Sequence, residues 1–317
     1  MTLSLQLPSP CEALLELQGV QIWLKRDDLI HPQVSGNKWR KLRYYWQDFE
    51  QSTKQEVLSF GGAFSNHLAA LAAAGKHLQI PTRALVRGEE LQHNPTLDFC
   101  RAQGMELEFI TRAAYREKDE PGFIAQLQES YPQSYIIPEG GKGSLGIKGC
   151  TEILKEVNEP FDWVCASLGT GTTASGLLLS AYPTQFLFFS ALKDQGYLKQ
   201  TLTQNVESLG ENYGLSPTEV TRRLANFEVN ADFHFGGYAK VTDELIEFMN
   251  TFFEKTGVKL DPVYTGKMLF GIYQLIHANY FQPGTRILAL HSGGLQGISG
   301  MNQKLKKQHK RTIIYEA

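Results

Sequence analysis

The chain has 317 residues, of which 42% are hydrophobic and 20% charged, and its formal net charge is -2. This composition is typical of a globular protein with a sizeable core, and the near-neutral charge argues against nucleic-acid binding through phosphate neutralisation. The four cysteines form no CxxC pair and have no metal-type spacing, so we expect reduced thiols and no bound metal. The N-terminus lacks a signal-peptide pattern and no apolar run reaches about 18 residues, which predicts a soluble cytoplasmic protein without a membrane partner.

Short apolar runs alternate with helix-length segments along the chain. Strands are expected at 57–60, 82–86, 105–110, 134–138, 163–167, 185–192, 227–233 and 286–290, and helices at 68–77 and from Pro95 towards Gln103. Ser65 or Asn66 is suited to cap the first of these helices. The rhythm restarts after residue 157, so we expect two α/β domains with parallel sheets and a site at the carboxyl ends of the strands.

Two features point to one kind of chemistry. Lys38 lies where a Gly-containing turn gives way to a helix-like stretch, and the Gly/Thr-rich segment 167–176 follows the apolar run 163–166. A fixed lysine can capture an aldehyde, and a glycine-rich loop leading into a helix can hold a phosphate. Taken alone, Lys38 is equally explained as a solvated surface charge and the loop as a tight turn. Together they predict a site for a phosphorylated aldehyde cofactor.

Four blocks of residues then occur in a characteristic order, and they are 35–42 (SGNKWRKL), 65–67 (SNH), 261–267 (DPVYTGK) and 291–294 (HSGG). Together they resemble the 1-aminocyclopropane-1-carboxylate deaminase and D-cysteine desulfhydrase family of pyridoxal-phosphate enzymes. The resemblance implies an α/β, tryptophan-synthase-β-like fold (fold type II), pyridoxal 5'-phosphate as cofactor and a homodimer. It also implies that a small domain, 46–157, is inserted into a large one, 1–45 plus 158–317, with the cofactor between them.

The resemblance assigns roles to the matched residues. Lys38 would form the Schiff base and move a proton at the substrate α-carbon, and desolvation together with Arg40 and Lys41 should lower its pKa. Ser65 and Asn66 would hold the substrate carboxylate and touch the phenolic oxygen of the cofactor, a role compatible with helix capping. The phosphate loop would comprise Gly169, Thr170, Gly171, Thr172 and Thr173. Thr172 replaces a glycine that is more frequent in the family, and should be tolerated if its φ is not positive.

Two tyrosines and two hydroxyl residues complete the implied site. Tyr264 would face the substrate, and Tyr238 is either a second such tyrosine or a packed aromatic residue. Thr265 and Ser292 would meet the pyridine nitrogen. His67 is interpreted as a packed or solvent-facing side chain in preference to a general base.

The substrate hypothesis rests on Thr265, which stands where the cyclopropane deaminases have glutamate. A hydroxyl partner makes the cofactor a weaker electron sink than a carboxylate would, which suits α,β-elimination of a good leaving group such as thiolate. The leading hypothesis is therefore a lyase that converts D-cysteine to pyruvate, ammonia and sulfide. The alternatives are a 1-aminocyclopropane-1-carboxylate deaminase that forms 2-oxobutanoate, a serine racemase or dehydratase, and a non-catalytic cofactor-binding protein. The segment 68–70 departs from the family pattern and indicates drift in substrate.

Overall fold

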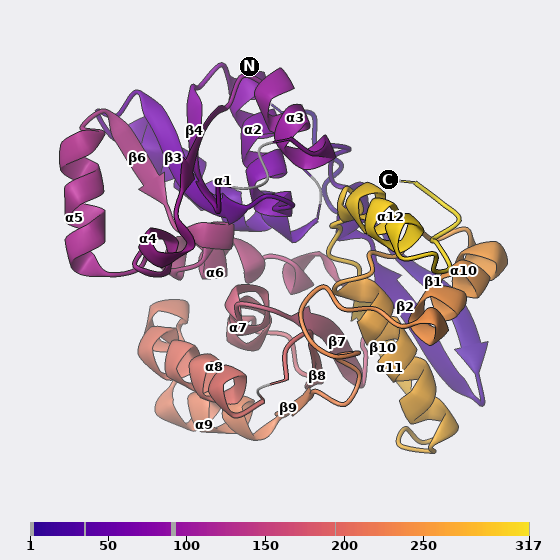
Figure 1. The fold of residues 1–317 in the computed structure, drawn as a ribbon. Coiled ribbons are helices and arrows are strands. Elements are labelled where there is room, and N and C mark those ends of the chain that lie inside the picture. Colours follow the sequence, from indigo (N-terminus) through magenta and orange to yellow (C-terminus); the bar gives the residue numbers. More distant parts are fainter. Residues whose placement is uncertain (1–2, 35, 90–92, 194, 317) are drawn as a thin grey trace.

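The chain forms two α/β domains, each built around its own sheet (Figure 1). In this computed structural model, residues 3–34, 36–89, 93–193 and 195–316 are described, so Ser35 of the first motif lies outside the described residues. Within these ranges no helix has the length and apolar character needed to cross a membrane.

The larger sheet has six strands in the order β1-β2-β10-β7-β8-β9. Its strands are β1 (Cys11–Leu17), β2 (Val20–Lys25), β7 (Trp163–Leu168), β8 (Gln185–Ser190), β9 (Phe227–Asn230) and β10 (Arg286–Leu290). Neighbouring strands are parallel except in the edge hairpin of β1 and β2. On β10, Ile287 and Ala289 pack into one hydrophobic cluster and Leu288 and Leu290 into another, so both faces of this sheet are buried.

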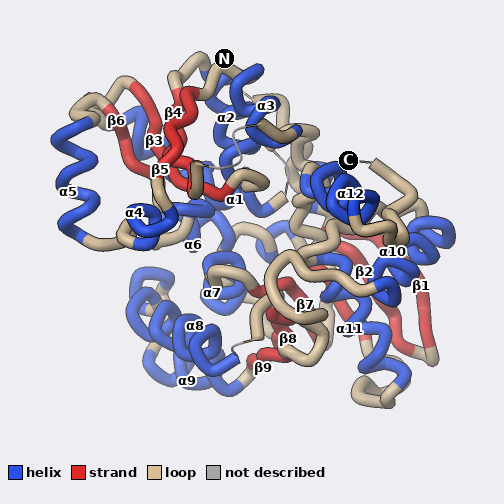
Figure 2. The backbone as a smooth tube through the Cα atoms, in the orientation of Figure 1, coloured by secondary structure: helices blue, strands red, loops and turns tan. Residues whose placement is uncertain are grey.

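The smaller sheet is entirely parallel, in the order β5-β4-β3-β6. Its strands are β3 (Glu56–Gly62), β4 (Thr82–Arg87), β5 (Glu106–Ile110) and β6 (Ser134–Ile137). Figure 2 shows α5 on one face of this sheet and α1 and α2 on the other. Leu58 and Leu85 pack towards α5, whereas Val57 and Val86 pack towards α1 and α2.

The helices cover both faces of the two sheets. They are α1 (Asn37–Gln51), α2 (Asn66–Leu78), α3 (Pro95–Ala102), α4 (Arg112–Arg116), α5 (Pro121–Ser130), α6 (Ser144–Cys150), α7 (Thr172–Leu179), α8 (Gln195–Leu209), α9 (Pro217–Ala225), α10 (Asp243–Thr256), α11 (Thr265–His277) and α12 (Gly297–Lys307). Short 3-10 helices lie at Asp27–Leu29, Glu139–Gly141, Leu154–Glu156 and Glu211–Tyr213.

Every strand predicted from the sequence is confirmed, although β8 ends at Ser190 and not at 192, and β9 ends at Asn230 and not at 233. Both predicted helices are confirmed as α2 and α3, and Ser65 is the N-cap of α2. The sequence analysis did not predict the β1-β2 hairpin. Its first strand lies at the sheet edge with Glu12 and Glu16 exposed, so it lacks the apolar run by which the central strands were identified.

The two ends of the chain contribute to the larger sheet, and the segment between them forms the smaller one. We propose that the domain boundaries fall after residues 45 and 157. Helix α1 runs unbroken through the first of these positions, and Leu42 and Tyr45 already pack in the small-domain core. The helix that carries Lys38 therefore joins the two domains.

A buried ion network anchors the start of α1 to residues just after β2 and just before β7. Arg40 is 1% exposed, and its guanidinium donates to Asp27 at 2.9 Å and to Glu156 at 2.6 and 2.8 Å. Lys25, at the end of β2, contacts the same Glu156 carboxylate at 2.7 Å. Burial acts to raise the pKa of Glu156, but the bonds from Arg40 and Lys25 outweigh it and lower that pKa to about 2. The network satisfies charges that would otherwise be buried at high cost.

Replacing Glu156 by Gln should lower the free energy of unfolding by about 3 kcal/mol at neutral pH. The depressed pKa of Glu156 means that its contribution is present above the ordinary glutamate value of 4.5 and disappears as the pH falls through about 2. Urea unfolding from neutral pH to acid pH measures both effects. Glu159→Gln is the control, because that carboxylate is 57% exposed and lies 3.7 Å from Arg286. Equal stability of the two variants would contradict this role of the network.

A close backbone approach fixes the turn before Lys38. Gly36 has φ 65°, and a Cβ at this position would lie 1.9 Å from the carbonyl oxygen of Ser292. That same oxygen accepts a hydrogen bond from the backbone N–H of Asn37 at 3.1 Å. Only glycine allows the turn to meet the segment after β10 at this distance.

Gly36→Ala should destabilise the protein by roughly 2 kcal/mol or more beyond the cost of Gly104→Ala. Both glycines have positive φ, but a Cβ at Gly104 meets nothing within 4 Å. The difference between the two variants therefore isolates the collision with Ser292. Denaturant unfolding of both variants gives the comparison, and similar midpoints would show that the turn can move aside without cost.

Candidate active site

Lys38 lies in the first turn of α1 and keeps part of its surface accessible. Among the described residues, its ammonium has no hydrogen-bond acceptor and no ion-pair partner. Desolvation lowers the pKa of Lys38 well below its ordinary value, and the charge of Lys41 lowers it further. Both effects increase the unprotonated share of this amine relative to an ordinary lysine.

Lys41, one helical turn later, is 5% exposed and also lacks an acceptor within the described part of the chain. Burial lowers its pKa, and the nearby thiol of Cys150 partly opposes this shift. The sequence analysis treated Lys41 only as a neighbour of Lys38. The i, i+3 spacing of the two lysines was the available signal that both lie on one face of α1.

Arg40 does not belong to this face, and its expected effect on Lys38 needs correction. Its guanidinium is held by Asp27 and Glu156, whose negative charges compensate it. Arg40 is not among the causes of the lowered pKa of Lys38, which are desolvation and Lys41.

The Gly/Thr loop connects β7 to α7, as the sequence predicts. Gly171 is the N-cap of α7 with φ 84°, and Thr172 begins the helix without a positive φ, so the condition placed on Thr172 is met. In the described structure no acceptor is found for the backbone N–H groups of residues 169–173. The hydroxyl groups of Thr170 and Thr172 lie 3.2 Å apart. This helix start is a concentration of unsatisfied donors.

The loop lies against the start of α1. The side-chain amide of Asn37 donates to the hydroxyl of Thr173 at 3.3 Å, and the thiol of Cys150 lies 3.9 Å from the same hydroxyl. Asn37 adjoins Lys38 in sequence, so the two features identified separately are adjacent in space.

Ser65 and Asn66 begin α2 at the carboxyl end of β3. The hydroxyl of Ser65 accepts from the backbone N–H of Leu68 at 3.3 Å. The amide nitrogen of Asn66 lies 3.5 Å from where a Cβ of Gly294 would stand, so it reaches the large domain. His67 is packed, with 2% exposure, and its Nε2 lies 2.8 Å from the hydroxyl of Ser59. Burial and the charges of Lys38 and Lys41 lower the pKa of His67 well below its usual value.

The two candidate tyrosines contact each other. Their ring centroids are 6.2 Å apart in an edge-to-face arrangement. A Cβ at Gly169 would lie 3.2 Å from the Tyr264 hydroxyl, which places this ring over the Gly/Thr loop. Tyr238 is 58% exposed and lies in a segment pinned by Lys267, whose ammonium donates to the carbonyl of Gly237 at 2.9 Å. Desolvation raises the pKa of both tyrosines, so both stay protonated near neutral pH.

Thr265 is fully buried, and Asp261 engages its hydroxyl. This hydroxyl donates to the Asp261 carboxylate at 2.6 Å and accepts from the Asp261 N–H at 3.0 Å. The same carboxylate accepts the backbone N–H groups of Val263, Tyr264 and Thr265 at 2.7–2.9 Å. Asp261 thus caps α11, a function that its place in the DPVYTGK block did not reveal. A contact of Thr265 with a cofactor ring is limited to its remaining acceptor position.

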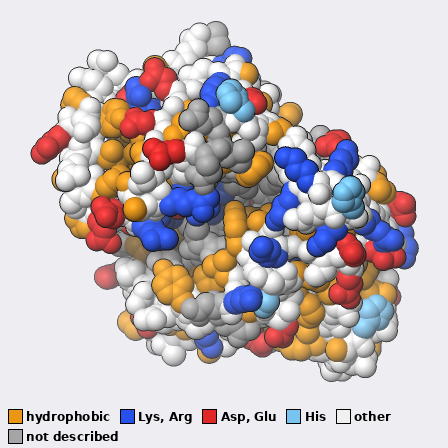
Figure 3. Space-filling view, viewed as in Figure 1, with side chains coloured by type: hydrophobic (Ala, Val, Ile, Leu, Met, Phe, Trp, Pro, Cys, Tyr) orange, Lys and Arg blue, Asp and Glu red, His pale blue; other side chains and the backbone are white. Residues whose placement is uncertain are grey.

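Ser292 follows β10 and is partly buried beside Gly36. Within the described ranges its hydroxyl has no hydrogen-bond partner, so it can still donate. The residues predicted for the site thus come together from the starts of α1, α2, α7 and α11, with Tyr238 at the outer edge. The space-filling view shows a hollow between the two domains with basic side chains on both sides (Figure 3).

Comparisons with known proteins identify the family of the chain. The profile of the pyridoxal-phosphate-dependent enzyme family matches residues 3–293. A putative 1-aminocyclopropane-1-carboxylate deaminase of Pyrococcus furiosus is 31% identical over 309 residues, which cover 92% of this chain and 89% of the relative. The bifunctional D-cysteine desulfhydrase/1-aminocyclopropane-1-carboxylate deaminase of Arabidopsis thaliana is 29% identical over 88% of this chain and 74% of its own.

A crystal structure described as an ACC deaminase homologue superposes with a TM-score of 0.80 at 24% identity, covering 96% of this chain and 94% of the other. This likeness confirms the fold expected from the four blocks. The chain therefore belongs to the pyridoxal-phosphate-dependent enzyme family and resembles its 1-aminocyclopropane-1-carboxylate deaminase and D-cysteine desulfhydrase members.

Proposed function

We propose that this enzyme is a lyase that converts D-cysteine to pyruvate, ammonia and sulfide by α,β-elimination. Support for the cofactor site comes from its unsatisfied groups. Lys38 and Lys41 lack anionic partners among the described residues, and so do the N–H groups of residues 169–173. Leaving such groups unpaired is costly, and a phosphorylated aldehyde fits them, with the aldehyde at Lys38 and the phosphate at Lys41 and the loop.

Bound pyridoxal phosphate would supply an electron-withdrawing ring that acidifies the hydrogen on the substrate α-carbon. The amine of Lys38 takes that proton, because its lowered pKa leaves a larger unprotonated share near neutral pH. Ser65 and the N-terminus of α2 hold the substrate carboxylate. Tyr264 keeps its proton and donates a hydrogen bond beside the reacting atoms. Loss of thiolate from the β-carbon and hydrolysis then give pyruvate and ammonia.

The preference for D-cysteine is inferred from Asp261, whose carboxylate is already hydrogen-bonded within the protein. This carboxylate accepts four hydrogen bonds at the start of α11, so it is not free to contact the ring nitrogen directly. Thr265 and Ser292 are then the proposed partners of the ring nitrogen, and both offer hydroxyl groups. A hydroxyl stabilises a protonated ring less than a free carboxylate does, which favours elimination of a good leaving group.

A second candidate is deamination of 1-aminocyclopropane-1-carboxylate. The observation that favours it is the position of Asp261, because its carboxylate accepts a hydrogen bond from the hydroxyl of Thr265, which is a proposed partner of the ring nitrogen. A charge relayed through that hydroxyl would strengthen the electron sink. The Arabidopsis relative carries both activities in its name. We also propose a homodimer, as the family resemblance implies, and a cytoplasmic location, which the unpaired cysteines favour.

Purified holoenzyme should release sulfide and pyruvate from D-cysteine at least about tenfold faster than from L-cysteine, since this corresponds to only about 1.4 kcal/mol of transition-state discrimination. The cyclopropane substrate should yield little 2-oxobutanoate, because the hydroxyl partners make a weak electron sink. Parallel assays of the three products measure both expectations, and Lys38→Ala is the inactive control. Efficient formation of 2-oxobutanoate by the wild type would replace the desulfhydrase assignment with the deaminase one.

A further inference from the structure

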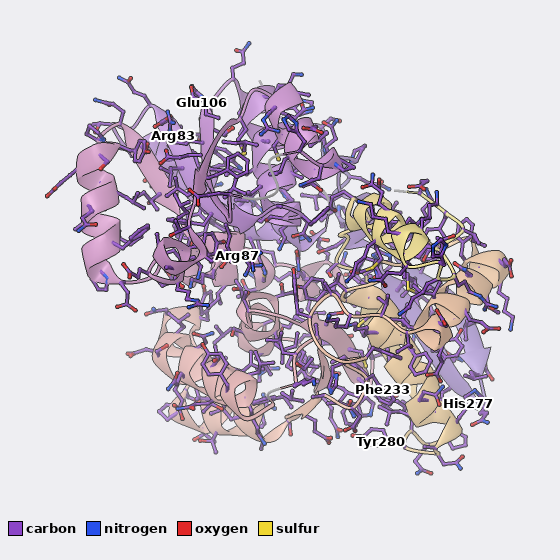
Figure 4. The ribbon with its side chains drawn as sticks, in the orientation of Figure 1. Arg83, Arg87, Glu106, Phe233, His277 and Tyr280 are labelled. Atoms are coloured by element: carbon purple, nitrogen blue, oxygen red, sulfur yellow. The ribbon has the colours of Figure 1, made fainter. Side chains whose placement is uncertain are left out.

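Arg87 ends β4 at the side of the small domain that faces the large one (Figure 4). Its guanidinium lies 3.7 Å from where a Cβ of Gly62 would stand, and Gly62 begins the turn that leads to Ser65. Its charge also acts on the hydroxyl of Tyr238, across the domain boundary. Arg87 therefore lies beside the residues proposed to hold the substrate.

A second arginine on the same strand shows what Arg87 lacks. Arg83 and Arg87 lie four residues apart on β4, on the same face, and each guanidinium lies over a tyrosine ring, at 5.1 Å and 5.8 Å respectively. Arg83 also pairs with Glu106 at 2.5 Å and with Glu56 at 3.5 Å. Arg87 has no hydrogen bond and no ion pair with the described residues.

The acidic groups near Arg87 are already compensated. Glu139 accepts from the hydroxyl of Tyr115 at 2.6 Å and pairs with Lys118 at 3.3 Å. Asp119 pairs with Lys142 at 2.5 Å and with Lys118 at 3.2 Å. Among the described residues, the guanidinium of Arg87 therefore has no compensating carboxylate at the substrate side of β4.

We propose that Arg87 is a specificity-determining residue that lets the site bind, besides D-cysteine, amino acids that carry an anionic group on the β-carbon. This inference rests on the proposed function only in taking the α-carboxylate to lie at Ser65. The ligand class is an amino acid with two anions, its α-carboxylate and a carboxylate or sulfonate on the β-carbon. The guanidinium of Arg87 lies over the ring of Tyr115. The planar guanidinium can donate two parallel hydrogen bonds to a carboxylate or sulfonate.

The test compares ligands that differ in side-chain charge but little in size. Aspartate and asparagine, each as the D- and the L-form, are titrated into the holoenzyme, and binding is followed by the change in cofactor absorption. We expect aspartate of the accepted hand to bind about tenfold or more tightly than asparagine. Arg87→Gln should abolish this preference, whereas Arg83→Gln, the matched control, should preserve it. A higher salt concentration should reduce the difference in affinity between aspartate and asparagine, because Arg87 is exposed and its charge is screened.

Equal affinity for aspartate and asparagine in both hands would overturn the proposal, as would a preference that survives in Arg87→Gln. A preference lost equally in both variants would also overturn it, because a general effect of β4 would then be responsible. The titration needs no turnover. A failure of D-cysteine as a substrate would therefore be visible separately, in the product assays alone.

Discussion

The start of α1 is the constraint on which the proposed site depends. Arg40 holds this helix to Asp27 and Glu156 on one side, and the glycine at position 36 lets the preceding turn meet Ser292 on the other. The helix cannot rotate without breaking a buried ion network or displacing backbone. Asn37, next to Lys38, contacts Thr173 of the Gly/Thr loop, and burial lowers the pKa of both Lys38 and Lys41. The ion pairs of Arg40 hold the helix in place, while Lys38 and Lys41 have no anionic partner among the described residues.

Four helix starts surround the same space. Asn37 links α1 to α7 through Thr173, the Tyr264 ring links α11 to the loop before α7, and Asn66 brings α2 against Gly294. Each helix start has the positive end of its dipole, and the start of α7 has unpaired N–H groups among the described residues. Together with two lysines, these groups favour ligands that carry several negative charges. A phosphate and a carboxylate bound together meet that requirement. The capping of α11 by Asp261 shows how one of these four starts is neutralised from within.

Much of this arrangement could be predicted from the sequence, because apolar runs and turn residues report directly on strands and loops. The βα units were predicted in this way, and the N-cap of α2 was narrowed to Ser65 or Asn66, of which Ser65 is the cap. The roles of Lys41 and Asp261 were not predicted. A lysine is expected to be solvated until its burial is known, and the sequence around an aspartate in a turn does not reveal its hydrogen-bond partners. The condition on Thr172 could be stated beforehand since φ depends on local sterics. The contact between Gly36 and Ser292 joins segments that are distant in sequence, so no local pattern could reveal it.

The central claim is that Lys38 holds the aldehyde of the cofactor while Lys41, three residues later, faces its phosphate. Borohydride reduction of the holoenzyme, followed by digestion and mass spectrometry that resolves the two lysines, tests this directly. We expect the cofactor mass on Lys38 alone in the wild type, and no attachment in Lys38→Ala. Attachment to Lys41, or to Lys267, whose pKa burial lowers to about 8, would contradict it.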